Sequence, residues 1–370
     1  MSPRTGLVLP DFPWDSLAPY VERARAYPGG MIDLSVGSPV DPTPAVIRDA
    51  LAAATDAHAY PLTAGSVPLR EAIVDWYSRR RGVDDLSIAN VLPTIGSKEF
   101  IGGLALWLGL GPGDVLVQPS RAYPTYAVGA ILAGATVVAS DDPAEWPENT
   151  RLVWVNSPAN PDGRILGVDR LAVAVARARE LGAVIASDEC YAELAWDSEG
   201  PSPSILDPRV IHGERNSVLS VYSLSKQSSL AGYRAAFVAG CSDLIAEILE
   251  VRKNLGLIPP LPVQAAMVAA LADEEHVAGQ RELYRRRRAA LIPAVEAAGM
   301  RIDSSEGGLY LWASAGEPAL STVARLADVG ILVAPGTFYG DPASQHVRIA
   351  LTATDEHIAE AVERLSTLSK

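Results

Sequence analysis

Seven short apolar segments between residues 90 and 239 constrain the fold more than any other feature of the chain. They are residues 90–95, 115–118, 136–139, 152–156, 183–187, 217–222 and 235–239, and helical or turn-rich stretches separate most of them. Apolar segments of this length predict buried strands. Strands that alternate with helices favour an α/β architecture. We therefore predict an α/β domain with a mainly parallel seven-stranded sheet.

The pattern changes after residue 256, where the proline-rich stretch 256–262 is followed by helical sequence. A long amphipathic helix is predicted at 275–298, then short strands at 308–313 and 347–351 and a C-terminal helix. The first 30 residues carry many prolines and aromatics, which indicates an arm that lies against something. We predict an arm and the start of a small domain at 1–42, a large domain at 43–275 and a smaller α+β domain at 276–370.

Composition excludes several classes of partner. The 370 residues carry a formal net charge of −13, which disfavours nucleic acid and anionic membranes. Four consecutive arginines at 285–288 lie in helical sequence and predict a solvated helix face. The two cysteines and five scattered histidines lack metal-ligand spacing, so we expect no metal. No signal peptide or membrane-spanning run is present, and we expect a cytoplasmic protein.

Polar residues stand where several predicted strands end. Asn156, Asp188 and Ser223 are examples. In open α/β sheets ligands bind at the carboxyl ends of the strands, so these residues could converge on one site.

The stretch from Ser223 to Arg234 places a lysine just past a strand end. Lys226 can form a Schiff base there, while Ser223, Ser225 and Arg234 offer hydroxyls and a planar cation to a phosphate. The alternative is a polar turn with a solvated lysine and a surface ion pair.

Residues 94–99, which include Gly96, Ser97 and Lys98, precede an apolar helix. Free backbone N–H groups at a helix start bind anions, although simple capping by Ser97 is the alternative. The glycines at 109, 111 and 113 follow this helix, so they do not form a dinucleotide-binding fingerprint.

Four further segments carry candidate site residues, each with a structural alternative. The loop at Asn160 could equally be a turn, and Asp188, three residues before Tyr191, could cap a helix. Tyr123 offers an aromatic face or core packing. Arg348 could clamp a carboxylate or form a structural salt bridge.

The order and spacing of these segments resemble the class I/II pyridoxal-phosphate aminotransferases of fold type I, from about residue 34 to the C-terminus. Lys226 with Ser223 and Arg234 is the most specific element, and the Asn160-Pro161-x-Gly163 and Asp188-x-x-Tyr191 motifs support it. The resemblance implies pyridoxal 5'-phosphate as cofactor, amino-acid and keto-acid substrates, and a large cofactor-binding domain.

The resemblance also implies roles for individual residues. Lys226 would hold the cofactor aldehyde, and Asp188 would pair with its ring nitrogen. The other implied cofactor contacts are stacking by Tyr123, hydrogen bonds from Asn160 and Tyr191 to the ring oxygen, and phosphate binding by Gly96, Ser97, Lys98, Ser223 and Arg234. The substrate α-carboxylate would be bound by Gly37, Asn160 and Arg348. Tyr60 would reach the phosphate of a neighbouring subunit, which implies a homodimer.

Two positions depart from the family pattern. Asp162 stands where threonine is usual, which puts an extra charge near the cofactor loop. Leu309-Tyr310-Leu311-Trp312 replaces the commoner aromatic pair after the glycines. Both departures are expected to bear on substrate choice.

Residues 91–99, 109–114 and 122–126 are most similar to actinobacterial N-succinyldiaminopimelate aminotransferases. This similarity implies ping-pong transfer of an amino group from glutamate to N-succinyl-2-amino-6-ketopimelate, in lysine and diaminopimelate biosynthesis. The alternatives are an aminotransferase for aspartate or aromatic substrates, a β-elimination lyase of the same fold, and a non-catalytic or regulatory relative.

Overall fold

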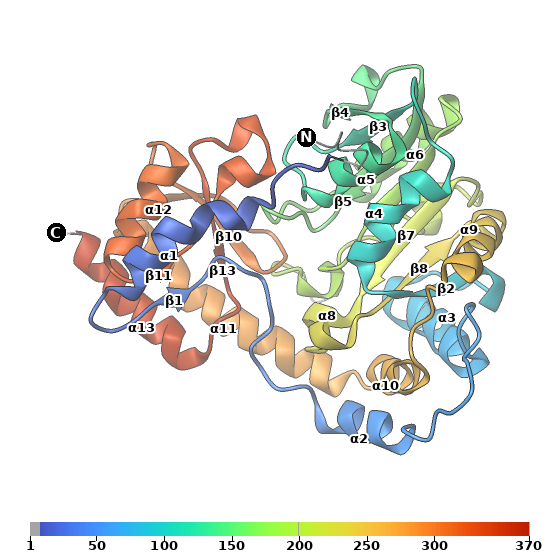
Figure 1. Ribbon diagram of the computed structural model, residues 1–370, viewed down its shortest axis with the longest axis horizontal. Coiled ribbons are helices and arrows are strands. Elements are labelled where there is room, and N and C mark those ends of the chain that lie inside the picture. The colour runs from blue at the N-terminus through green and yellow to red at the C-terminus, as the bar shows by residue number, and fades with distance from the viewer. Residues whose placement is uncertain (1–7, 199, 370) are drawn as a thin grey trace, which may run out of the picture.

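A seven-stranded sheet forms the centre of the larger part of the molecule (Figure 1). The structure is a computed structural model that describes residues 8–198 and 200–369. The strand order is β2-β8-β7-β6-β5-β3-β4. The strands are β2 (Val91–Ile95), β3 (Val115–Gln118), β4 (Thr136–Ala139), β5 (Thr150–Asn156), β6 (Val184–Asp188), β7 (Val218–Ser223) and β8 (Ala235–Gly240).

The predicted mainly parallel sheet is confirmed, and each strand begins and ends within two residues of its expected limits. β4, β3, β5, β6 and β7 pair in parallel, whereas β8 runs antiparallel to both of its neighbours. The spatial order of the strands differs from their order in the chain, which the spacing of apolar segments does not predict.

Helices cover both faces of this sheet. One face packs against α2 (Ala45–Ala53), α3 (Val67–Arg81), α6 (Val168–Glu180), α7 (Pro208–Ile211) and α10 (Leu261–Ala272). The other face packs against α4 (Ser97–Trp107), α5 (Thr125–Ala133) and α9 (Ser242–Leu255). Because successive strand residues point to opposite faces, Val153 lies in the first core and Trp154 in the second.

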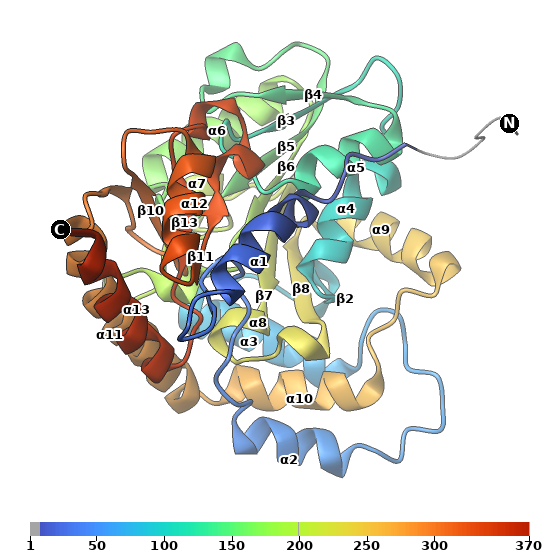
Figure 2. The ribbon, with the colours of Figure 1, turned by 60° about the vertical axis from the view of Figure 1, so that its left-hand side comes forward.

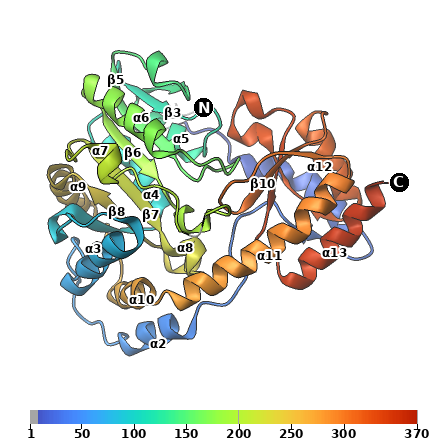
Figure 3. The same ribbon diagram turned by 180° about the vertical axis from the view of Figure 1, so that it is seen from behind.

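A second group of elements follows α11 (Glu275–Ala297), which runs from α10 toward α13 (Figure 3). A four-stranded antiparallel sheet has the order β12-β13-β10-β9. Its strands are β9 (Arg301–Ser304), β10 (Tyr310–Ser314), β12 (Ala334–Pro335) and β13 (Val347–Ala350). Helices α12 (Ala319–Asp328) and α13 (Asp355–Ser366) pack with it in a separate hydrophobic core.

The N-terminal segment lies with these C-terminal elements. Helix α1 (Ala18–Arg25) packs against α12 (Figure 2), and β1 (Ile32–Asp33) pairs in parallel with β11 (Ile331–Leu332). This pairing agrees with placing the start of a small domain before residue 42. The domain limits at 42 and 275 themselves stay a prediction.

The arginine run on α11 is only partly solvated. Arg285 and Arg286 are exposed, as expected. The prediction is wrong for Arg287, which is buried and forms ion pairs with Asp41 and Asp355. Helix α11 packs against α13, and the buried Arg287 cation needs carboxylate partners to balance its charge.

Within residues 8–198 and 200–369, none of the helices has the combination of length and apolar sequence that crossing a membrane requires. Cys190 and Cys241 are both free thiols.

Candidate functional site

The carboxyl ends of β5, β6 and β7 meet at one edge of the large sheet. Asn156 at the end of β5 lies directly opposite Asp188 at the end of β6, and β7 ends beside them at Ser223. A cavity of about 970 Å³ opens at this edge, and residues of the C-terminal elements, including Tyr310 and Arg348, close its other side. The predicted convergence of strand-end residues is therefore confirmed for Asp188 and Ser223.

Most of the predicted site residues line this cavity. They are Gly37, Ser97, Lys98, Tyr123, Asn160, Asp188, Tyr191, Ser223, Lys226, Arg234 and Arg348. Two predicted residues do not line it. Gly96 has φ +75°, and a Cβ there would stand 2.2 Å from Arg234 Nη2, so only glycine lets this guanidinium approach the start of α4. Tyr60 is 98% exposed, and its predicted reach into a neighbouring subunit stays a prediction.

Lys226 lies in the short helix α8 (Leu224–Gln227), directly after β7. Ser223 caps this helix by accepting a hydrogen bond from the Ser225 backbone N–H. The Lys226 amine donates to the Gly37 carbonyl oxygen. Burial lowers the pKa of the amine, which increases the share of the neutral, nucleophilic form.

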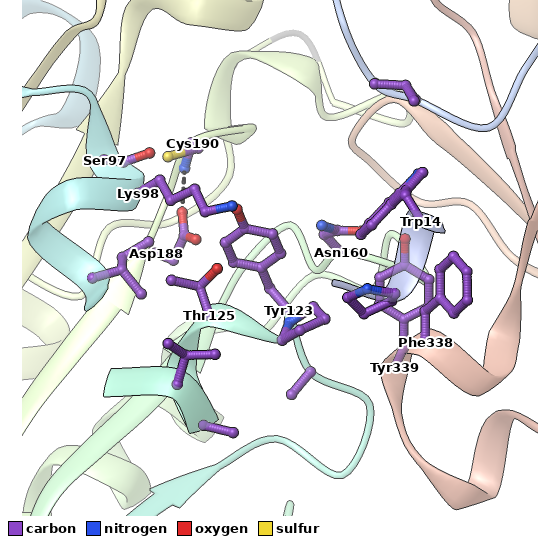
Figure 4. Close-up of a pocket in the computed structure, with 18 of the residues that line it drawn as sticks. Trp14, Ser97, Lys98, Tyr123, Thr125, Asn160, Asp188, Cys190, Phe338 and Tyr339 are labelled. Carbon is purple, nitrogen blue, oxygen red and sulfur yellow. Dashed lines mark hydrogen bonds between the residues drawn. The ribbon is translucent and has the colours of Figure 1, made fainter. Parts of the chain in front are cut away.

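Asp188 is buried, and two donors hold its carboxylate. The Tyr126 hydroxyl donates to Oδ2 at 2.9 Å. The Cys190 backbone N–H donates to Oδ1 at 3.2 Å (Figure 4). Burial raises the pKa of the carboxyl group, against these hydrogen bonds. Within the described residues Asp188 forms no ion pair, so a protonated ring nitrogen in the cavity would supply its missing cation.

The start of α4 faces the cavity with uncapped backbone donors. Ser97 is the first residue of the helix, and Gly96 in the N-cap position makes no side-chain capping bond. The predicted alternative, capping by Ser97, is therefore wrong. Arg234 is exposed and donates to the Ala231 carbonyl at 2.9 Å. Together with the Ser223 hydroxyl, these groups form a cradle suited to a phosphate.

Arg348 on β13 is buried, with 2% of its surface exposed. Its Nη1 donates to Asn160 Oδ1 at 2.8 Å, and its Nη2 donates to the Ser35 carbonyl at 2.6 Å. The Asn156 side chain fixes this loop by accepting from the Asn160 backbone N–H at 2.7 Å. The predicted alternative, a structural salt bridge, is not found among the described residues.

Aromatic residues that the sequence did not identify as site residues complete the cavity. Phe12, Trp14, Tyr310, Phe338 and Tyr339 all line it. The ring centroids of Trp14 and Phe338 are 5.1 Å apart, and those of Phe12 and Trp14 are 5.5 Å apart. In Figure 4, Trp14 and Phe338 lie on the opposite side of Tyr123 from Lys98. The sequence predicted that the aromatic N-terminal segment packs against another part of the protein. Its residues Phe12 and Trp14 form part of the wall of this cavity.

The two departures from the family pattern have different positions. The Asp162 carboxylate is buried between Arg121 and Arg164, at 2.9 Å and 2.8 Å, and Asp162 does not line the cavity. Its expected effect on substrate choice therefore has no direct contact to support it. Tyr310 does line the cavity, where its hydroxyl lies 3.1 Å from the Tyr191 hydroxyl.

Comparisons with known proteins point to one family. The family model described as aminotransferase class I and II matches residues 29–365. A probable aminotransferase of Mycobacterium tuberculosis is 54% identical, covering 97% of this chain and 85% of the relative. The 4-dedimethylamino-4-oxo-anhydrotetracycline transaminase of Streptomyces rimosus is 53% identical, covering 97% and 99%. The solved structure of N-succinyldiaminopimelate aminotransferase from Mycobacterium tuberculosis is 26% identical, with a TM-score of 0.86 and 96% coverage of both chains.

Proposed function

Since the chain belongs to the class I and II aminotransferases, we propose that it transfers the amino group of glutamate to N-succinyl-2-amino-6-ketopimelate by a ping-pong mechanism. Members of this family depend on pyridoxal 5'-phosphate and have the fold type I architecture, and both features extend to this chain. The choice of substrate rests on one observation. Four cations line the cavity, and none of them has a carboxylate partner among the described residues.

Two of these cations fit the cofactor. Lys226 is positioned to hold the cofactor aldehyde, and Arg234 is positioned at the cradle for its phosphate. The buried Asp188 carboxylate, which lacks an ion pair, suits the ring nitrogen. When bound, the cofactor supplies a protonated ring that withdraws electrons from the substrate Cα.

The other two cations fit a substrate with two carboxylates. Arg348 presents a planar guanidinium for the α-carboxylate, held in place by Asn160. Lys98 remains, and its Nζ lies 5.4 Å from the centroid of the Phe12 ring. Figure 4 shows Lys98 and Asn160 on opposite sides of Tyr123. We assign Lys98 to the distal carboxylate that glutamate and the succinylated acceptor share.

The residues of this chain divide the chemistry between them. Lys226, with its lowered pKa, would move the proton from the substrate Cα to the carbon of the bound cofactor in the first half of the reaction, and would move a proton back to the Cα of the acceptor in the second half. Asp188 keeps the ring nitrogen protonated, because its carboxylate has no other cation to neutralise it. Arg348 orients the substrate so that the Cα proton faces Lys226.

The test compares acceptors with glutamate as donor, following the formation of 2-oxoglutarate. We expect kcat/KM to be much higher for N-succinyl-2-amino-6-ketopimelate than for phenylpyruvate. Lys98→Ala should lower kcat/KM for the succinylated acceptor about fivefold, which corresponds to the loss of a solvent-exposed ion pair. The value of kcat/KM for phenylpyruvate should stay unchanged. Lys253→Ala, which removes an exposed lysine paired with Glu250, is the matched control.

Either of two results would contradict this assignment. A preference for phenylpyruvate would exclude the succinylated keto acid as the acceptor, but it would leave the assignment as an aminotransferase intact. An equal loss on both acceptors would show that Lys98 serves the cofactor instead.

A second candidate is amino transfer to a polycyclic aromatic ketone. The aromatic wall formed by Phe12, Trp14 and Phe338 favours it, because fused rings stack on such surfaces. The relative from Streptomyces rimosus, named for a tetracycline-type substrate, supports it as well. Turnover of a fused-ring ketone faster than the succinylated keto acid would favour this candidate over the first.

We also propose that the chain acts as a homodimer in which Tyr60 contributes to the site of the neighbouring subunit. Its near-complete exposure in the single chain is compatible with such a contact. An inactive-subunit mixing experiment, described in the Discussion, tests this part of the proposal.

A further inference from the structure

Tyr310 occupies the point where the main chemical groups of the cavity meet. Its ring lies under the Arg348 guanidinium, whose central carbon is 3.9 Å from the ring centroid. Its hydroxyl lies 3.1 Å from the Tyr191 hydroxyl. A Cβ on Gly37 would stand only 2.0 Å from the Tyr310 hydroxyl oxygen, so this phenol lies directly against the Gly37 backbone.

The Lys226 amine reaches the same piece of backbone. It donates to the Gly37 carbonyl, and Gly37 is therefore in contact with both the amine and the phenol. Tyr310 comes from β10 and Lys226 from α8, so the two groups belong to different parts of the molecule. The contact is specific to glycine, because any side chain at residue 37 would collide with the phenol.

The charges around Tyr310 explain why its hydroxyl is chemically useful. Burial by itself would raise the pKa of this phenol, but Arg348, Lys226 and the hydrogen bond with Tyr191 hold that pKa below its ordinary value. The ionisable groups that face it from the surrounding elements are Tyr123, Asp188, Tyr191, Lys226, Tyr284, Tyr339 and Arg348. The two cations in this set, Lys226 and Arg348, favour the ionised form of the phenol and so increase the negative charge on its oxygen.

We propose that Tyr310 is a positioning residue with two separable parts: its hydroxyl stabilises the positive charge on the Lys226 nitrogen, and its ring face holds Arg348 in place for the substrate carboxylate. This inference rests on the proposed role of Lys226. The phenol oxygen presents negative charge density to the nitrogen, which favours the protonated nitrogen over the neutral one. The guanidinium is held by attraction to the face of the ring.

The two parts can be tested by two substitutions at the same residue. Tyr310→Phe keeps the ring and removes the hydroxyl, whereas Tyr310→Leu removes both. In the Tyr310→Phe holoenzyme, the pH midpoint of the visible absorbance of the bound cofactor should fall by about half a pH unit or more, because the nitrogen loses a stabilising neighbour. Its KM for glutamate should stay unchanged. The Tyr310→Leu enzyme should show the same midpoint shift and also a raised KM for glutamate.

Tyr339→Phe is the matched control. Tyr339 is buried in the same cavity and faces the same guanidinium, at 5.1 Å, but its hydroxyl has no hydrogen-bond partner in the described structure. Loss of that hydroxyl should leave the absorbance midpoint where it is in the unsubstituted enzyme. A shift of equal size in both variants would indicate a general change in the cavity and overturn the proposal.

An unchanged or raised midpoint in Tyr310→Phe also overturns it. If Tyr310→Phe does not fold, the Tyr310→Leu enzyme provides the second reading, because it lacks the same hydroxyl. Its midpoint should fall by about half a pH unit or more, and no movement would overturn the proposal. Borohydride reduction distinguishes failure of this proposal from failure of the proposed function. If reduction fixes the cofactor to Lys226 but the absorbance midpoint of Tyr310→Phe does not move, only the role of Tyr310 is refuted.

Discussion

Replacing Tyr126 by phenylalanine should make Asp188, the carboxylate that we propose holds the cofactor ring nitrogen, harder to ionise. The Tyr126 hydroxyl donates to Asp188 Oδ2 at 2.9 Å in a buried environment. The ring itself stacks on Trp154, with centroids 5.1 Å apart and an interplanar angle of 16°, and phenylalanine preserves that packing. The substitution therefore removes one hydrogen bond to a carboxylate and little else.

The size of the effect follows from that bond. A hydrogen bond to a charged group contributes about 1.5–3 kcal/mol, and about 1.4 kcal/mol corresponds to one pKa unit. Burial already raises the pKa of Asp188, and the Tyr126 bond opposes that rise. Losing the bond should raise the pKa of Asp188 further, by about one to two units.

The assay is the pH dependence of kcat in the holoenzyme. The acid limb of the profile should move to higher pH by about one to two units, since Asp188 must be ionised to keep the ring nitrogen protonated. Tyr77→Phe is the matched control, because it removes a buried hydroxyl that bonds Ser220 at 2.8 Å instead of Asp188. An acid limb that stays in place in Tyr126→Phe, or that moves equally in Tyr77→Phe, would show that the Tyr126 hydrogen bond does not set the pKa of Asp188.

Two further predictions concern stability and assembly. Burial opposes the ionisation of Asp41, but its hydrogen bonds with Arg287 and other groups lower its pKa. The stability that it contributes is therefore fully present above the unfolded pKa of about 3.9 and is lost as the pH falls through the lower pKa of the folded state. Asp41→Asn should thus cost about 1.5–3 kcal/mol in urea unfolding at pH 7 and much less at pH 3; an equal cost at both values would argue against the ion pair. For assembly, mixing Tyr60→Ala with Lys226→Ala subunits should restore activity, because one site of each mixed dimer holds both intact residues, and complete subunit exchange without recovery would place Tyr60 in its own chain's site.

The strands and the motif residues could be predicted from sequence because their signals are local. The apolar run before Asp188 and the polar residues after it are contiguous in the chain. The same is true of Ser223 and Lys226. Such patterns predicted each strand of the large sheet to within two residues, and most of the polar residues that they identified line one cavity.

What sequence could not supply were contacts between distant segments. The Tyr310 hydroxyl meets Gly37 and Tyr191, and Trp14 packs on Phe338, across separations that no spacing pattern covers. Asp162 was expected to bring an extra charge near the cofactor loop. Its two arginine partners are visible only once the chain is folded.

The spatial order of the strands in the large sheet also depends on contacts between distant segments. β8 follows β7 directly in the chain and pairs with it, but its other neighbour is β2, which is distant in the chain. That placement makes β8 antiparallel to its neighbours and sets Arg234, just before β8, beside the start of α4. A local pattern predicts the strand but not its partners.

Borohydride reduction of the holoenzyme, followed by mass analysis of the digested chain, determines which lysine carries the cofactor. We expect the cofactor to be fixed to Lys226 in the unsubstituted protein, and Lys226→Ala to lose both the visible absorbance and nearly all turnover. Labelling of a different lysine, or a coloured and active Lys226→Ala enzyme, would contradict this expectation.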